Sequence, residues 1–177
     1  MQNKGCLVLK DIAPSEICLR CIFQPLYIKS NGLLKREALL PPPNRNRNDV
    51  SLLRQNYMSL EECISHGKNT HIDKQSFVAI ASITRKDVQA NNLWAHAKDS
   101  TGYVNGTTAD IYYAPMSNGK YISLDIDVFS NDPDVDLPAH ADLRYDSVLS
   151  GTVQTRMRQY ASELVKKMKT IYHVDAK

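Results

Sequence analysis

The segment Phe77–Ile83 is a nearly continuous apolar run, Phe-Val-Ala-Ile-Ala-Ser-Ile, and it constrains the fold more than any other stretch of this chain. A short apolar run of this length is typical of a strand that is buried on both faces. At 177 residues the chain has the length of one domain. A chain of this size buries roughly 70% of its unfolded surface, so it needs neither a disulfide nor a metal to hold a core. We therefore expect a single domain over residues 1–177.

Other short segments also have the pattern of strands and turns. Strands are predicted at Cys6–Lys10, Ile17–Phe23, Ala109–Ala114, Lys120–Val128 and His140–Tyr145. The turn that ends in Asn118-Gly119 favours a hairpin between the third and fourth of these strands, and hence antiparallel pairing. Because strands and helices do not alternate strictly, the predicted class is α+β, with helices on one face of a mostly antiparallel or mixed sheet.

Two short helices are indicated by their first residues. Ser59 and Glu62 form a capping box, in which each side chain can bond the backbone N–H of the other. Gly67 stands where a helix would end in the left-handed conformation, so the helix is predicted over Leu60–His66. A similar start predicts a second short helix over residues 84–91.

The C-terminal part of the chain has the pattern of a longer helix. Apolar residues recur at steps of three or four, which predicts a long amphipathic helix over Thr152–Tyr172. Its basic residues, off the apolar stripe, are Arg156, Arg158, Lys166, Lys167 and Lys169. Basic helices bind phosphate backbones, although a solvated helix surface has the same pattern.

Composition and charge limit the class of protein. The chain has 22 Lys and Arg against 19 Asp and Glu, a net charge of +3 that does not by itself imply nucleic-acid binding. Its N-terminus has no apolar run of signal-peptide length, and no stretch could span a bilayer. Its four cysteines are therefore expected to be reduced thiols. These features predict a cytoplasmic protein that does not associate with a membrane.

Two cysteine pairs have the spacing of metal ligands. Cys18 and Cys21 are three residues apart, as are Cys63 and His66, and two such pairs could form a zinc site. Cys18 and Cys21, however, lie in a predicted strand, where alternation would point them to opposite faces. Packed thiols are therefore favoured, and the same position argues against a redox motif, which requires a helix N-terminus.

Acidic residues also suggest a metal, but less strongly than they suggest a solvated surface. The run from Asp132 lacks the glycine and glutamate that an EF-hand calcium loop requires. Asp125 and Asp127 would share the wet side of one strand and could hold magnesium. A solvated strand face explains them better, so we predict neither a metal nor a cofactor.

The segment 36–54 combines arginines with hydroxyl and amide donors, and from residue 39 onward it has no helical or strand periodicity. Arginine recognises phosphate and carboxylate groups with two parallel hydrogen bonds. We therefore predict a binding loop, with Arg36, Arg45, Arg47, Asp49, Ser51 and Arg54 as its binding residues. The segment contains no glycine and is not a phosphate-cradling P-loop, and a solvated loop is the alternative.

His140 is the candidate catalytic residue. It stands where an irregular loop enters a predicted strand, a position that often presents a side chain into a cleft. A histidine in such a place can act as a general acid or base, since its pKa lies near neutral pH. The alternative is a structural hydrogen bond within the loop.

Several of these stretches together resemble a scattered group of small, uncharacterised bacterial proteins. The resemblance rests on the turn and apolar segment Asn31–Pro41, the Asp49-x-Ser51-x-x-Arg54 loop, the Ser59–Gly67 helix and the Pro138-Ala139-His140-Ala141 segment. It covers about half of the chain and excludes residues 87–108. The resemblance implies an accessory or effector role near mobile-element or phage-defence genes.

Three functional hypotheses follow. The first is a small accessory or partner-binding protein of a bacterial defence or toxin–antitoxin-like system, which contacts another protein through residues 36–54. The second is an enzyme acting on a nucleotide or nucleic acid, and it requires Arg54, Ser51 and His140 to converge in one pocket. The third is a nucleic-acid-binding protein that uses the basic C-terminal helix.

Overall fold

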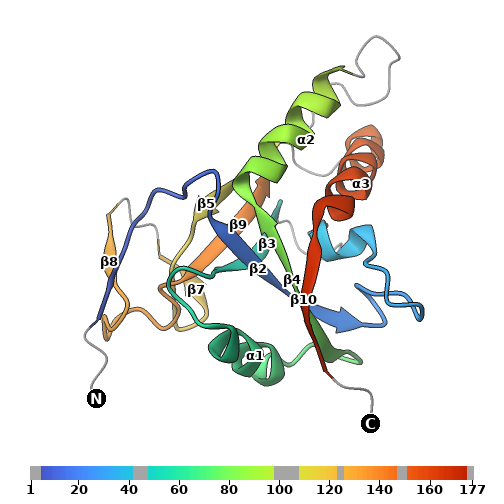
Figure 1. The fold of residues 1–177 in the computed structure, drawn as a ribbon. Helices are drawn as coiled ribbons and strands as arrows, with labels where there is room; N and C mark the ends of the chain where they lie inside the picture. The colour runs from blue at the N-terminus through green and yellow to red at the C-terminus, as the bar shows by residue number, and fades with distance from the viewer. Residues whose placement is uncertain (1–4, 42–47, 98–107, 123–125, 147–150, 175–177) are drawn as a thin grey trace.

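The centre of the fold is a six-stranded sheet in which every pair of neighbouring strands is antiparallel. The structure is a computed structural model that describes residues 5–41, 48–97, 108–122, 126–146 and 151–174 (Figure 1). In spatial order the strands are β10 (Lys169–His173), β4 (Ser76–Thr84), β2 (Ile17–Gln24), β3 (Asp49–Arg54), β9 (His140–Tyr145) and β5 (Ala109–Tyr113). The α+β class and the antiparallel sheet predicted from the sequence are confirmed.

Two short ribbons lie outside this sheet. Strand β1 (Leu7–Val8) pairs with β8 (Val128–Phe129), and β6 (Met116–Ser117) pairs with β7 (Lys120–Tyr121). The predicted hairpin between 109–114 and 120–128 is therefore wrong. The Asn118-Gly119 turn, with positive φ at both residues, closes on its immediate neighbours and leaves β5 to pair with β9.

Helices cover both faces of the sheet, whereas the sequence predicted helices on one face only. Helix α1 (Leu60–Asn69) packs against β2 and β4, where the Sγ of Cys21 lies 3.9 Å from the backbone oxygen of Cys63. Helices α2 (Arg85–Ala97) and α3 (Gly151–Leu164) lie on the other side (Figure 1). There the rings of Tyr145 and Tyr160 meet edge to face at 5.7 Å. Within the described ranges, no helix is long and apolar enough to cross a membrane.

The start of α1 is as predicted, but its end is not. The Ser59 Oγ accepts from the Glu62 N–H at 3.2 Å, and the Glu62 carboxylate accepts from the Ser59 N–H at 2.7 Å. Gly67 does not end the helix but is buried inside it. The Phe77 ring lies so close that a Cβ at this position would be 2.4 Å from it. The glycine thus allows α1 to approach β4 closely.

The predicted C-terminal helix over 152–172 is too long. Helix α3 ends at Leu164, a 3₁₀ turn η3 (Val165–Lys167) follows, and the chain then forms β10 along the edge of β4. The helical spacing of apolar residues does continue past Leu164. The β-branched and aromatic residues of 169–173, however, gain a hydrogen-bond ladder with β4 that local periodicity does not reveal.

The sequence predicted that the segment 39–54 is irregular throughout, and this prediction is wrong. Residues 36–39 form the short 3₁₀ helix η1 (Arg36–Leu39), and residues 49–54 form the inner strand β3. Strand β3 pairs with β2 on one side and β9 on the other, and Val50 and Leu52 are buried in the core. Hydrogen bonding to strands on both sides makes residues 49–54 extended. The polar run 44–48 that precedes them gave no sign of a strand in the sequence.

Candidate functional site

The pairing of β3 with β9 brings the predicted binding loop beside the predicted catalytic histidine. Leu53 lies opposite His140, Ser51 opposite Asp142, and Asp49 opposite Arg144. Cross-strand partners share a face, and so do alternate residues along a strand. Asp49, Ser51, His140, Asp142 and Arg144 therefore share one face of the sheet, which we call the polar face.

His140 is held in a fixed orientation on this face. Its side chain is 2% exposed, and its Nδ1 lies 2.7 Å from the backbone oxygen of Ala114. Because a carbonyl oxygen only accepts, Nδ1 carries a proton and donates it there. Nε2 then faces Asp142, whose Oδ1 is 3.9 Å away and whose side chain is 1% exposed.

Tyr121, which comes from the β6–β7 hairpin, covers the polar face. Its hydroxyl lies 2.8 Å from Asp49 Oδ2 and 3.5 Å from Asp142 Oδ1, and its ring centroid lies 5.8 Å from that of His140. Since a phenol has one proton, the shorter contact identifies Asp49 as the main acceptor. This network ties the hairpin to the sheet, while Ser51 and part of Arg144 remain exposed to solvent.

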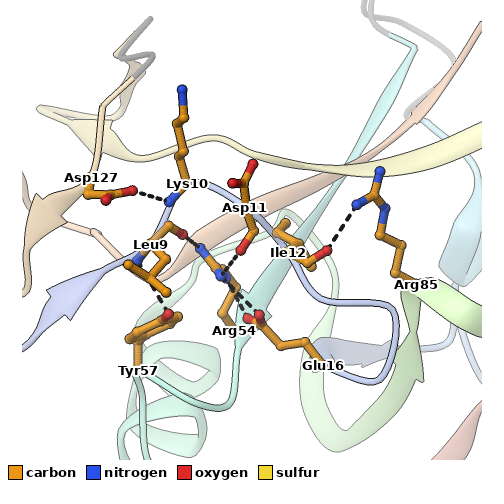
Figure 2. A network of polar contacts seen from close by, with 9 residues as sticks. All are labelled: Leu9, Lys10, Asp11, Ile12, Glu16, Arg54, Tyr57, Arg85 and Asp127. Atoms are coloured by element: carbon orange, nitrogen blue, oxygen red, sulfur yellow. Dashed lines mark hydrogen bonds and ion pairs between the residues drawn. The ribbon is translucent and has the colours of Figure 1, made fainter.

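Arg54 does not join the polar face. Its side chain is 0% exposed, and Nε and Nη2 lie 2.5 and 2.9 Å from the two carboxylate oxygens of Glu16 (Figure 2). It also donates to the backbone oxygens of Leu9 and Asp11, and the Tyr57 ring lies 4.6 Å away. The structure thus brings Ser51 and His140 together without Arg54. Phosphate binding by Arg54 would require the release of Glu16.

Arg54 is instead the centre of a clamp on the N-terminal segment 9–12 (Figure 2). The Leu9 N–H donates to the Tyr57 hydroxyl at 3.3 Å, and Arg85 donates to the Ile12 carbonyl at 2.9 Å. The Lys10 N–H donates to Asp127 at 2.7 Å. Asp127 therefore serves this segment, while Asp125, its partner in the predicted magnesium pair, lies outside the described residues.

Arg36 and Lys166 are far apart in the sequence, but both line one groove. A groove of about 720 Å³ runs between the turn 29–37 and the end of α3. Its basic residues are Lys29, Lys35, Arg36 and Lys166, and its apolar residues are Leu33, Leu34, Val165 and Met168. The carboxylate among its described lining residues is that of Glu37. We call this hollow the basic groove.

Three cations of the basic groove contact nearby acceptors, and at least two of them remain exposed to solvent. Arg36 Nε lies 3.3 Å from Glu37, and Lys166 Nζ lies 2.5 Å from Glu163, with the Arg36 and Lys166 side chains 44% and 66% exposed. Lys35 Nζ donates to the Pro25 carbonyl at 2.6 Å. Such exposed ion pairs are weak, so a stronger anion can replace them. Because α3 ends at Leu164, Lys166 reaches the groove from η3 and not from a basic helix.

Cys18, Cys21 and Cys63 are buried thiols, whereas Cys6 is exposed. In the pairing of β2 with β4, Cys18 lies opposite Ile83 and Cys21 opposite Ile80 without a register shift between them, so the two thiols lie on opposite faces of β2, as predicted. Burial raises the pKa of Cys18 and Cys63 to about 12. Burial also lowers the pKa of His66. Among the residues that the structure describes, no three His, Cys, Asp or Glu side chains are grouped so that they could hold a metal ion.

Two predicted binding residues, Arg45 and Arg47, lie in 42–47, outside the described residues. Sequence reasoning missed Tyr121 and the cations at 29 and 35. The lysines flank the predicted Asn31-Gly32 turn, and that position could have marked them. Comparison with protein-family models, curated proteins and solved structures found no match to this chain.

Proposed function

We propose that this protein is a binding module for another protein, and that the basic groove takes an acidic segment of that partner. The observation that carries this proposal is the meeting of cations from two segments that are far apart in the sequence. Lys29, Lys35 and Arg36 come from the turn 29–37 and Lys166 from η3, and apolar residues of both segments line the groove beside them. Opposite charge on a partner would steer it to this groove and fix its orientation.

The composition of the groove favours a protein over a nucleic acid. A site for single-stranded bases combines cations with aromatic side chains on which bases stack. No aromatic residue is among the lining residues of the groove within the described part of the chain. Leu33, Leu34, Val165 and Met168 suit apolar side chains of a peptide, which a phosphate backbone does not supply.

Arg36 belongs to the segment that the sequence predicted as a contact surface for a partner protein. Its place in the groove supports that hypothesis, and residues 162–170 supply a second wall that the hypothesis did not include. The expectations that the partner belongs to a bacterial defence or toxin–antitoxin-like system, and that the protein is cytoplasmic, stay predictions.

The proposal is tested by charge reversal. Tagged wild-type protein and the Arg36→Glu/Lys166→Glu variant are purified from the native host after nuclease treatment. We expect a protein partner with the wild type and at least about tenfold less of it with the variant, since two attractive contacts become repulsive. Crosslinking of the complex, followed by mass spectrometry, should place the contact on the turn 29–37.

The matched control is Lys68→Glu/Lys86→Glu, which makes the same change of net charge at exposed positions in α1 and α2, outside the groove. This control should keep the partner. Equal loss from both variants would refute the groove as the binding site. A ligand that nuclease removes, and whose affinity falls steeply with salt, would identify nucleic acid as the partner instead.

A second candidate function, an enzyme acting on a nucleotide, loses Arg54, which is paired with Glu16, but is still favoured by the meeting of Asp49, Ser51 and His140 on the polar face. Arg144 would contact phosphate, and His140 would transfer a proton. A thermal-shift screen of nucleotides tests this: a substrate should raise the melting temperature of the wild type but not of Arg144→Gln. If both proteins respond equally, or neither responds, the polar face has only a structural role.

A further inference from the structure

Strand β10 forms one edge of the six-stranded sheet. It pairs with β4 on one side, and within the described residues no strand pairs with its other side. An edge strand presents backbone N–H and C=O groups that can pair with another extended chain. Lys169 and the bulge at Ile171 limit uncontrolled pairing along this edge, as is common in natural sheets.

The basic groove lies beside this edge. Met168 and Thr170 both line it, and these alternate residues project to the same side of the extended chain. Thr170 lies opposite Ala81, which in turn lies opposite Arg20, on the face of the sheet that α3 covers. A strand added to β10 would therefore direct every second side chain into the groove.

We infer that the partner segment binds in an extended conformation and pairs with β10 as a further strand. This inference rests on the proposed function, since it concerns the same groove. Backbone hydrogen bonds to the stretch before the bulge would supply part of the affinity, and the alternate side chains in the groove would supply specificity. The ligand should thus carry acidic or apolar residues at every second position.

A second copy of this chain does not suit the site. A copy placed edge to edge would bring its own Lys169 and its own basic groove against the first. Like charges opposed in this way repel, and the chain has a net charge of +3. The groove is complementary to an acidic segment from a different protein.

Peptide selection tests this inference and the proposed function separately. A library of random 12-residue peptides displayed on phage is selected on the wild-type protein and counter-selected on Arg36→Glu/Lys166→Glu. Enrichment of acidic peptides with apolar residues at alternate positions supports both. Acidic peptides with apolar residues at steps of three and four would overturn the extended mode but keep the proposed function. Enrichment without acidic residues, or none, would overturn both.

N-methylation of the best peptide gives a second measurement. Methyl groups on the amides that face β10 should weaken binding by at least tenfold, while the same groups on the outward amides should leave it unchanged. In hydrogen exchange, the bound peptide should slow the outward amides of β10. Equal affinity of the two methylated peptides, with no protection of β10, would refute the strand pairing even if the peptide still bound the groove.

Discussion

The buried pair of Arg54 and Glu16 allows a quantitative test of what holds the N-terminal segment in place. Both side chains are nearly inaccessible, at 0% and 3%, and the guanidinium also bonds two backbone oxygens. Removing one partner of a buried ion pair leaves an unpaired charge in the interior, which costs about 3–5 kcal/mol. We therefore expect Glu16→Leu to lower the free energy of unfolding by an amount in this range.

Arg54→Met should cost at least as much, because it leaves both Glu16 and the carbonyl groups of Leu9 and Asp11 without a donor. An unsatisfied buried acceptor adds about 1–3 kcal/mol. The double variant removes both charges. Its loss of unfolding free energy should therefore be smaller than the sum of the two single losses, by about 2–3 kcal/mol. Urea unfolding followed by circular dichroism measures all four free energies of this cycle.

The exposed pair of Arg36 and Glu37 is a control of the same chemistry, with side chains 44% and 39% exposed. Glu37→Gln should change stability by less than about 1 kcal/mol. If Glu16→Leu does not fold at 25 °C, Glu16→Gln reports the same loss of charge with less change of shape. Additive effects within about 0.5 kcal/mol, or a loss below about 1 kcal/mol for both Glu16 variants, would refute the buried-charge argument.

Three further predictions concern other parts of the fold. Gly67→Ala should destabilise the protein by about 1–3 kcal/mol in urea unfolding, although alanine favours helices, because its methyl group would overlap the Phe77 ring; Lys68→Ala, on the exposed side of the helix, should be nearly neutral. Burial lowers the pKa of His66, so just below pH 6.5 the unfolded chain binds more protons than the folded protein, and the free energy of unfolding decreases as the pH falls. His66→Gln should lose this part of the pH dependence of stability. An unchanged pH profile in the variant would contradict the prediction. In the native protein at pH 8 a thiol reagent should modify Cys6 rapidly and the three buried thiols only after denaturation, and rapid reaction of more than one thiol would exclude their packing.

Local patterns in the sequence predicted the elements whose cause is local. The apolar run of 77–83 became β4, and the reciprocal caps at Ser59 and Thr84 began α1 and α2. In each case the interactions that form the element lie within a few residues of one another. The antiparallel class followed in the same way, although the particular hairpin predicted from Asn118-Gly119 did not.

The candidate site could be predicted only in part. Asp49, Ser51 and His140 were singled out by residue type, and their meeting on one face depended on the pairing of β3 with β9. The destination of Arg54 was hidden, because its partner Glu16 is 38 residues away. Nothing local distinguishes an arginine that will bind a ligand from one that will neutralise a buried carboxylate.

By itself, then, the sequence determined where α1, α2, β2, β5 and β9 begin and which side chains carry charge. The tertiary structure decided that residues 169–173 extend along β4 and that Lys166 faces Arg36 across a groove. The physical reason is the range of the interactions. Caps and periodic apolar faces act between neighbours in the chain, whereas an edge ladder and a shared groove join segments that only the folded core brings together.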